Sequence, residues 1–273
     1  MKGPERRPLS LLMALFLSGF FLLTDGFSAL AAVESSYNEK LGELQQRLMT
    51  RGLPEKDLSR VFSDGRVELI PEIVERKGKG LNYRGRRFGL LTKKSVREGK
   101  SLLRANRGIL HKIETTYGVG REILVAVLRI ETNFGRVKGH YPIFNSLLTM
   151  ALIENRRSGW AEEELGCLLL MCRGEKKDPF SIKGSWAGAF GIPQFVPSSY
   201  LKYGVDGNGD GIIDLDNLAD AFASIANYLK SFGWSPQNSW EKKEALFAYN
   251  HCDNYVRAVL AYAQAIKRQA GIR

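Results

Sequence analysis

Apolar residues recur three or four positions apart along most of the chain, which is the spacing of one face of a helix. Over residues 37–62 this spacing is interrupted at Gly52-Leu53-Pro54, so two short helices are expected there. Residues 95–117 are expected to be helical, and a strongly apolar helix is expected from Arg121 to the sequence Asn133-Phe134-Gly135. Further helices are expected at residues 143–154, 160–173, 218–232 and 241–268.

Two segments lack this spacing. Residues 174–200 are rich in Gly, Ser and Pro, and residues 206–220 form an acidic, Gly-rich stretch, so both are expected to be loops. The period-two alternation that is typical of strands is scarce. The sequence therefore predicts a mainly α fold (α+β) without a long internal repeat.

The N-terminus has the three parts of a secretory signal peptide. Lys2, Arg6 and Arg7 precede an almost wholly apolar run at residues 9–23, and Ala29-Leu30-Ala31 offers a small-x-small cleavage pattern. The alternative is an uncleaved membrane anchor, but the run is shorter than the roughly 18–20 residues that a span needs. No Cys precedes Cys167 to carry a lipid, so residues 1–31 are expected to be a cleaved signal peptide of an exported, periplasmic protein.

Positive charge is concentrated in one window. The 273 residues include 40 Lys+Arg and 29 Asp+Glu, which gives a formal net charge of +11. Residues 76–107 contain 12 basic residues and a single acid, Glu98, so this window holds the whole excess. Such a block suggests a polyanionic partner. Export argues against nucleic acid and leaves an anionic cell-wall or membrane surface, with a solvated face that aids solubility as the alternative.

The cysteines are few. Cys167, Cys172 and Cys252 make an odd number, so at least one thiol is free unless two chains are bridged. The first two lie five residues apart in an expected helix, where side chains point about 140° apart. Free thiols are therefore expected.

The first chemical motif is Glu131 in the sequence Glu-Thr-Asn-Phe-Gly, at the end of the most apolar expected helix. Apolar surroundings raise the pKa of a carboxyl group. A Glu that stays protonated near neutral pH can donate a proton to a leaving oxygen. Taken alone, a Glu at a helix end that makes a local hydrogen bond is the commoner interpretation.

The second motif is residues 184–200, which read Gly-Ser-Trp-Ala-Gly-Ala-Phe-Gly-Ile-Pro-Gln-Phe-Val-Pro-Ser-Ser-Tyr. Its glycines allow a ligand to approach the backbone closely. Ser185 and Gln194 offer hydrogen bonds, and Trp186 and Phe195 offer flat apolar faces. Such a mixture is suited to sugars, although a structural loop packed by aromatic residues would share these features. A third, weaker motif is Ala248-Tyr249-Asn250, expected at the start of the last long helix.

Together these three motifs resemble the B-type family of lytic murein transglycosylases. The resemblance covers residues from about 82 to the C-terminus and implies a lysozyme-like catalytic core. It implies Glu131 as the lone catalytic residue, with Ser185 and Gln194 supporting it and the substrate. It further implies contacts to the peptide or lactyl side of the substrate, and to its sugars, from these residues: Arg156, Arg157, Tyr83, Tyr228, Tyr249, Asn250 and Tyr255.

A fourth motif, residues 206–214, matches the first nine positions of an EF-hand loop. Asp206, Asn208 and Asp210 supply side-chain oxygens, and Ile212 supplies the carbonyl of position 7. Position 12 is an Asn rather than the usual Glu. The family resemblance implies an elongated loop closed by Asp220, and therefore a structural Ca²⁺ site and no organic cofactor. An acidic turn without metal and a Ca²⁺ sensor remain alternatives.

The resemblance also implies a mechanism and a domain plan. Glu131 would protonate the glycosidic oxygen between MurNAc and GlcNAc in peptidoglycan and then act as the base for intramolecular attack, which forms 1,6-anhydro-MurNAc. The alternatives are a hydrolysing muramidase and a non-catalytic peptidoglycan-binding scaffold. The expected domains are the signal peptide 1–31, a helical basic region 32–110 that flanks the cleft, and the catalytic core 111–273 with its calcium loop at 206–220.

Overall fold

We analysed a computed structural model, which describes residues 23–76, 82–83, 85 and 88–268. The chain divides into two compact units, Met1–Asp64 and Gly65–Arg273. Part of the expected signal peptide, residues 1–22, lies outside the described residues, as do Arg84, Arg86 and Arg87 of the basic window. In the part of the chain that is described, no helix has both the length and the apolar character that crossing a membrane requires.

The smaller unit contains the two helices expected there. These are α1 (Leu23–Thr50) and α2 (Glu55–Phe62), and the break between them falls at the predicted position. Gly52 takes the left-handed conformation, with φ of 88°, and Pro54 precedes the first residue of α2. α1 begins well before the expected residue 37.

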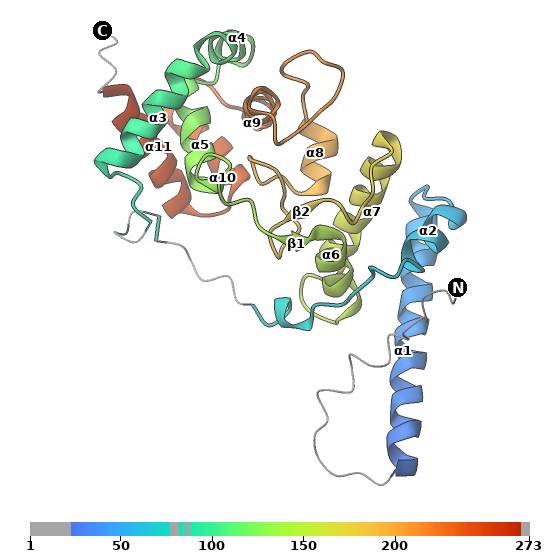
Figure 1. The fold of residues 1–273 in the computed structure, drawn as a ribbon. Helices are drawn as coiled ribbons and strands as arrows, with labels where there is room; N and C mark the ends of the chain where they lie inside the picture. Colours follow the sequence, from blue (N-terminus) through green and yellow to red (C-terminus); the bar gives the residue numbers. More distant parts are fainter. Residues whose placement is uncertain (1–22, 77–81, 84, 86–87, 269–273) are drawn as a thin grey trace, which may run out of the picture. The chain divides into compact units, whose positions relative to one another are not determined.

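The larger unit contains one group of helices built around α5 (Arg121–Thr132), as Figure 1 shows. Leu124, Val127 and Leu128 of α5 are fully buried, because neighbouring helices cover this helix on several sides. The helices that pack on α5 are α3 (Lys93–Ala105), α4 (Arg107–Tyr117), α9 (Leu218–Ser231) and α11 (Asp253–Arg268). α10 (Ser239–Tyr249) packs on α9 and α11.

A second group of elements in this unit surrounds a short β-sheet. α6 (Ile143–Leu152) packs on α7 (Ser158–Glu175), and α7 packs on α8 (Pro197–Tyr203). β1 (Tyr141–Pro142) and β2 (Lys183–Gly184) pair antiparallel, with Tyr141 opposite Gly184. The 3₁₀ helix η3 (Pro71–Ile73) contacts α6. The predicted mainly α fold with little β structure is therefore confirmed.

Two expected helices are each divided in two. Residues 95–117 form α3 and α4, which are separated at Asn106, whose side-chain amide donates to the Leu102 carbonyl. Residues 241–268 form α10 and α11, because Asn250 is extended and ends α10. Tyr249 therefore ends a helix, whereas the prediction that it begins the last long helix was wrong. Asparagine side chains compete with helical hydrogen bonds, which is why they occur at these breaks.

Two further features of the larger unit are the expected domain boundary and the cysteines. The boundary expected near residue 110 lies within α4, inside the larger unit, because α3 and α4 share a core with α5 and α9. Cys167, Cys172 and Cys252 form no disulfide in the part of the chain that the structure describes. Both Cys167 and Cys172 lie in the unbroken helix α7.

Candidate active site

Glu131 is the penultimate residue of α5, at a point where the chain turns sharply. Asn133, Phe134 and Gly135 all have positive φ, at 50°, 63° and 85°, so the helix cannot continue. Thr132 Oγ1 donates to the Ile192 carbonyl at 2.9 Å and accepts from the Gly135 amide at 2.9 Å. The helix end that carries Glu131 is thereby fixed to the Gly-rich loop.

The Gly-rich loop folds tightly because side chains are excluded at its glycines. A Cβ on Gly184 would overlap the Ala189 carbonyl, and Gly188 has φ of 82° with a Leu147 side chain against it. Ser185 Oγ accepts from the amides of Ala187 and Ala189, at 3.3 and 3.1 Å. The expected support of Glu131 by Ser185 would therefore act through the shape of this loop, since its side chain is engaged with the loop backbone.

Gln194 holds the other end of the same loop. It adopts φ of 54°, and its Nε2 donates to the carbonyls of Lys138 and Gly191, at 3.1 and 3.0 Å. The side chain therefore joins the segment after the Glu131 turn to the Gly-rich loop.

Several aromatic residues line up from Gln194 toward Glu131. The rings of Tyr228 and Tyr249 have centroids 4.9 Å apart, and Phe195 lies 5.7 and 5.9 Å from them. The Tyr249 ring is nearly parallel to that of Tyr255, with centroids 6.2 Å apart, and Tyr83 meets Tyr255 edge-on at 5.8 Å. Residues that are far apart in sequence thus form one aromatic cluster.

The hydroxyls of this aromatic cluster are held by specific partners. Tyr249 donates to the Pro193 carbonyl at 2.7 Å, and Tyr228 donates to the Ala248 carbonyl at 2.8 Å. Asn250 forms a side-chain hydrogen bond with Tyr83. The rings are therefore fixed in orientation, as a preorganised sugar site would require.

The surroundings of Glu131 raise its pKa to about 7, because burial disfavours the charged carboxylate. The side chain nevertheless keeps part of its surface accessible. Burial also raises the pKa of Tyr83 to about 12, and the negative charge of Glu131 adds to this effect. The pKa values of Tyr249 and Tyr255 are raised by the same two causes, in the same order. Glu131 therefore lies among three neutral tyrosines.

Tyr255 interacts with Glu131 directly. Its side chain is fully buried, and its hydroxyl lowers the pKa of the Glu131 carboxyl. Tyr255 and Glu131 do not form a hydrogen bond of normal geometry, since the buried Tyr255 hydroxyl has no such partner among the described residues. Because Tyr255 has no exposed surface, it is placed to act through Glu131. The same burial disfavours the sugar contact that was expected from Tyr255.

Arg156 and Arg157 immediately precede α7. Arg156 is exposed, and the Arg157 guanidinium lies over the Trp186 ring at 5.6 Å from its centroid. The Arg157 amide donates to Asn155 Oδ1 at 2.8 Å. Arg157 thus stacks on Trp186, which is next to Ser185 in the Gly-rich loop.

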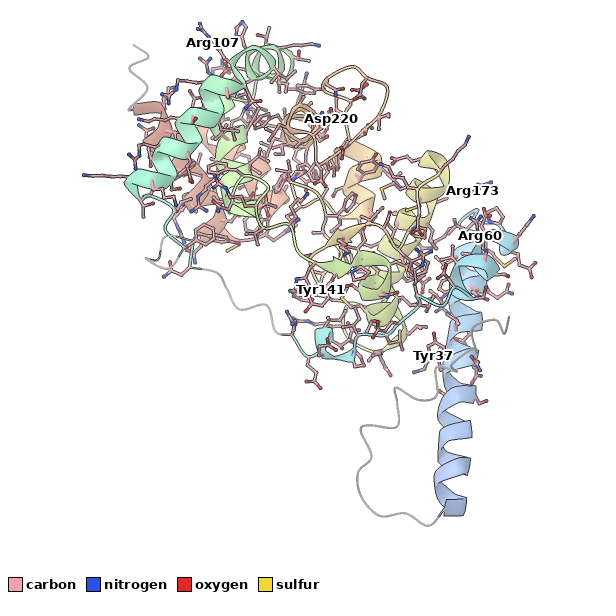
Figure 2. The ribbon with its side chains drawn as sticks, viewed as in Figure 1. Tyr37, Arg60, Arg107, Tyr141, Arg173 and Asp220 are labelled. Atoms are coloured by element: carbon pink, nitrogen blue, oxygen red, sulfur yellow. The ribbon has the colours of Figure 1, made fainter. Side chains whose placement is uncertain are left out.

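The acidic loop is closed by Asp220, which lies at the start of α9 (Figure 2). Asp220 is fully buried, and its two oxygens accept from the amides of Gly207, Asn208 and Asp214 at 2.9, 3.3 and 2.8 Å. Asn217 does not close the loop, because its side chain caps α9 by accepting from the Ala219 amide. This contact pattern agrees with Asp220 as the closing carboxylate.

The side chains of this acidic loop offer the kind of ligand atoms that a hard cation prefers. Asp206 accepts from the amides of Gly209 and Gly211, which lower the pKa of its carboxyl. Asp206, Asn208, Asp210 and Asp220 each offer side-chain oxygen, which fits the chemistry of Ca²⁺. Within the described ranges, however, no three His, Cys, Asp or Glu side chains converge closely enough to hold a metal.

The sequence missed two residues of the site. Thr132 joins the helix that carries Glu131 to the Gly-rich loop. In the sequence, only its place directly after Glu131 could have pointed to this role. Cys252 lies close enough to Tyr83 for a thiolate charge to raise the pKa of that tyrosine. No sequence pattern pointed to Cys252, because its position depends on the turn between α10 and α11.

The arrangement is suited to proton transfer by a single carboxyl group. No second carboxylate in the described residues contributes to the pKa of Glu131, whereas ordinary glycosidases place two carboxyl groups across the bond that they cleave. A group with a pKa of about 7 can both give and take a proton near neutral pH.

Comparisons with known proteins agree with this arrangement. The family model described as Transglycosylase SLT domain matches residues 36–244. Membrane-bound lytic murein transglycosylase B of Escherichia coli (strain K12) is 41% identical over 157 residues, which are 58% of this chain and 43% of that protein. The chain thus aligns with less than half the length of this curated relative.

Two solved structures show a similar fold. The Escherichia coli lytic transglycosylase Slt35 in complex with calcium has a TM-score of 0.74 at 26% identity, covering 84% of this chain and 93% of that one. The soluble lytic transglycosylase SltB1 from Pseudomonas aeruginosa has a TM-score of 0.76 at 25% identity, covering 85% of this chain and 99% of that one.

Proposed function

The chain belongs to the Transglycosylase SLT domain family, and on this premise we propose that it is a lytic transglycosylase of peptidoglycan. The substrate is the β-1,4 bond between MurNAc and GlcNAc, and the product carries a 1,6-anhydro-MurNAc end. The observation that carries the proposal is Glu131, a lone carboxyl group among tyrosines with a pKa of about 7.

The mechanism uses Glu131 twice. Its proton moves to the glycosidic oxygen while the bond from that oxygen to C1 of MurNAc breaks. The C6 hydroxyl of the same MurNAc then bonds to C1, and its proton returns to Glu131. A tethered hydroxyl has a high effective concentration, so a second carboxylate that activates water is dispensable.

The other expected residues are proposed to bind and orient the glycan. Tyr83, Tyr228 and Tyr249 offer ring edges and faces to the sugars, and Asn250 fixes Tyr83. Gln194 ties the Gly-rich loop to the segment after the Glu131 turn, and Ser185 holds the shape of that loop. These roles are supported by the fixed orientations of the side chains.

The remaining members of the site face the substrate's acidic part or act on Glu131. Arg156 and Arg157 are proposed to meet the lactyl or peptide carboxylates of the substrate, since guanidinium groups suit such partners. Tyr255 is proposed to position Glu131 and to set its proton affinity, because it is buried beside that carboxyl group.

We further propose a structural Ca²⁺ ion held by Asp206, Asn208, Asp210, Asp220 and the Ile212 carbonyl. Support comes from the similar structure of Slt35, which is a complex with calcium. When bound, the ion would stabilise the loop between α8 and α9 and would take no part in the chemistry. Ile212 is 59% exposed, which agrees with a contribution from its main chain alone.

The place of action is proposed to be the periplasm, after removal of residues 1–31. The basic window at residues 76–107 is proposed to contact the anionic cell wall or membrane surface. Support comes from the described members of the window on α3 and at the start of α4, since Lys93, Lys94, Arg97, Arg104 and Arg107 are all exposed.

The activity is tested by comparing Glu131→Gln with wild type on purified sacculi. The variant keeps the size of the side chain and loses its proton chemistry, so release of soluble fragments should fall by about 10³-fold or more. Glu163→Gln on the exposed face of α7 is the matched control and should release fragments at the wild-type rate. Equal release by Glu131→Gln and wild type would refute the proposed role of Glu131.

A further inference from the structure

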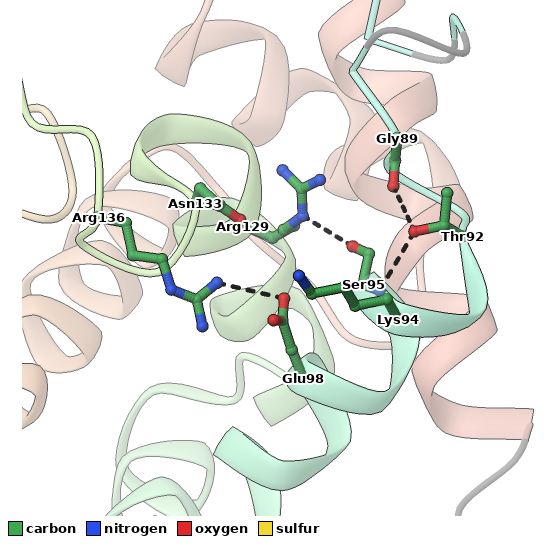
Figure 3. A pocket seen from close by; sticks show the side chains of 8 residues that line it. All are labelled: Gly89, Thr92, Lys94, Ser95, Glu98, Arg129, Asn133 and Arg136. Carbon is green, nitrogen blue, oxygen red and sulfur yellow. Dashed lines mark hydrogen bonds and ion pairs between the residues drawn. The ribbon is translucent and has the colours of Figure 1, made fainter.

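A pocket lies beside α5, and none of its lining residues belongs to the expected active site. It has a volume of about 450 Å³ and is lined by residues from the start of α3, from α5 and from the turn after α5. Arg129 and Glu131 are two residues apart on one helix, so their side chains point about 160° apart around its axis. Figure 3 shows the lining residues Gly89, Thr92, Lys94, Ser95, Glu98, Arg129, Asn133 and Arg136.

The charges of this pocket do not cancel. Three lining residues are cationic, namely Lys94, Arg129 and Arg136, and the only acid among them is Glu98. Glu98 pairs with Arg136 at 3.2 Å, as the dashed line in Figure 3 shows. The pocket therefore keeps a net charge of +2 that no acid of its own lining balances.

Arg129 is the cation whose position is most costly. Only 7% of its surface is exposed, and its partners are neutral: Nε donates to Ser95 Oγ at 2.8 Å and Nη2 to the Phe88 carbonyl at 3.0 Å. Burial lowers its pKa, the charges of Tyr262 and Glu98 oppose this effect, and the charge of Arg136 adds to it. No carboxylate hydrogen-bonds this buried guanidinium among the described residues, and Glu98 is ion-paired with Arg136, so a bound anion would stabilise Arg129.

Donors remain available for such an anion. The hydrogen bonds of Arg129 to the described residues use Nε and Nη2 and none of them uses Nη1. α3 starts at this pocket and has no acid in its first turn, so the positive end of its dipole adds to the field. Thr92 caps that end by accepting from the Ser95 amide at 3.2 Å. Lys94 and Arg136 supply further positive charge to the lining, and Arg136 is paired with Glu98.

We propose that this pocket binds a phosphate group, either as free inorganic phosphate or carried by a small saccharide. A phosphate carries a charge between −1 and −2 near neutral pH and offers several acceptor oxygens, which match a net +2 and donors on different sides. The pocket has a volume of about 450 Å³. This volume leaves room for a carrier beside the phosphate.

The test is calorimetric titration of the full chain at constant ionic strength. The probes are inorganic phosphate, N-acetylglucosamine 6-phosphate and, as the uncharged control, N-acetylglucosamine. Both phosphates should bind and the neutral sugar should not. Tighter binding of the sugar phosphate would show that the carrier is recognised as well, and equal binding would show that the phosphate group alone is recognised. Failure of both phosphates to bind would overturn the proposal.

Variants locate the binding in the pocket. Lys94→Gln combined with Arg136→Gln should weaken phosphate binding by about tenfold or more, since charge-assisted hydrogen bonds are lost. The matched control, Lys93→Gln with Arg97→Gln, removes the same charge from exposed positions of α3 that do not line the pocket. The control should change the affinity less than twofold. An equal loss in both pairs would show general attraction by the basic surface and would contradict a built site.

Arg129→Lys distinguishes the contribution of the guanidinium geometry to phosphate binding from the contribution of the positive charge. Lysine keeps the positive charge but lacks the planar fork of donors, so phosphate binding should weaken while the fold is retained. Circular dichroism and the unfolding temperature show whether each variant is folded. Unchanged phosphate affinity in folded Arg129→Lys would overturn the assignment of Arg129 to the site.

Discussion

At the residue scale, the proposed chemistry depends on how Glu131 holds its proton. The apolar helix and the aromatic cluster raise the pKa of its carboxyl group to about 7, while Tyr255 opposes this rise. The same group must be protonated when it acts as an acid. The rate should therefore fall as the pH rises through the pKa of Glu131.

Tyr255→Phe tests this balance. The variant removes the hydroxyl that lowers the pKa of Glu131, so the fall in activity on the alkaline side should move to higher pH. The pH profile of fragment release from sacculi is the measurement. Tyr262→Phe is a matched control on the same helix, because its buried hydroxyl donates to the Ser95 carbonyl at 2.6 Å, and its alkaline limb should stay in place. If the alkaline side of the pH profile stays in place in Tyr255→Phe, the proposed role of Tyr255 in positioning Glu131 is contradicted.

The raised pKa also makes a prediction for stability. Glu131 ionises near 4.5 when unfolded and near 7 when folded, so folding takes up a proton between these values and stability falls as the pH rises through this window. Glu131→Gln should therefore be more stable than wild type at pH 8 by about 1 to 3 kcal/mol, since one pKa unit corresponds to about 1.4 kcal/mol. The difference should be smaller at pH 4, where the carboxyl is neutral in both states.

Urea unfolding of wild type and Glu131→Gln at these two pH values measures the difference. Glu163→Gln, at an exposed position of α7, supplies the control and should show no such pH dependence. A constant difference in stability between Glu131→Gln and wild type would show that Glu131 is not desolvated in the folded protein.

The sequence anticipated part of this residue-scale arrangement. The apolar run before Glu131 was visible, and it accounts for the burial that raises the pKa of its carboxyl group. The burial of Tyr255 could not be foreseen, because it depends on how α11 packs against α5. Arg129 was likewise hidden, since a basic residue within an apolar run gives no sign of the pocket beside it.

At the element scale, turns decide what the helices bring together. The sequence predicted most helices of the larger unit, but it joined α3 with α4 and α10 with α11, and the start of α8 falls in a segment that was expected to be a loop. Helical periodicity continues through Asn106 and Asn250, whereas the breaks depend on the backbone conformations of these residues. The break after Tyr249 matters most, because it lets α10 and α11 each contribute a tyrosine to the aromatic cluster.

The Gly-rich loop makes a prediction of its own. Gly184→Ala should destabilise the protein by about 2 kcal/mol or more, because the added methyl group would overlap the Ala189 backbone. Gly159→Ala in α7 is the matched control, since its Cβ would meet no atom within 4 Å. The control should be neutral or stabilising by up to about 1 kcal/mol. Thermal unfolding measures both variants, and equal stabilities would contradict the tight packing of this loop.

The acidic loop makes a second prediction at this scale. Asp220→Ala leaves three backbone amides without their buried acceptor, so stability should fall by about 2 to 4 kcal/mol. If Asp220 also closes a Ca²⁺ site, adding Ca²⁺ should raise the unfolding temperature of wild type but not of this variant. EGTA should reverse the rise in wild type.

Asp216→Ala provides the control for the calcium experiment. Its carboxylate is exposed and pairs with Lys138 at 2.8 Å, and it is not among the expected ligands. This variant should keep the rise of the unfolding temperature with Ca²⁺. No rise in wild type, or an equal rise in Asp220→Ala, would contradict the proposed calcium site.

At the scale of the whole molecule, the charge and the catalytic centre are separate features. The excess positive charge of the chain lies in residues 76–107, and the described members on α3 and α4 are mostly exposed. Lys94 alone among them lines the pocket beside α5. Attraction to an anionic wall remains a prediction that rests on composition, whereas the phosphate site rests on the arrangement of particular residues.

The whole-molecule account proposes one carboxyl group acting on a glycan without water. The measurement that tests it most directly is mass analysis of the fragments that wild type releases from purified sacculi. Intramolecular attack predicts 1,6-anhydro-MurNAc ends, which lack one water relative to hydrolysed ends, and predicts none from Glu131→Gln. Reducing MurNAc ends from wild type, or anhydro ends released undiminished by Glu131→Gln, would contradict the account.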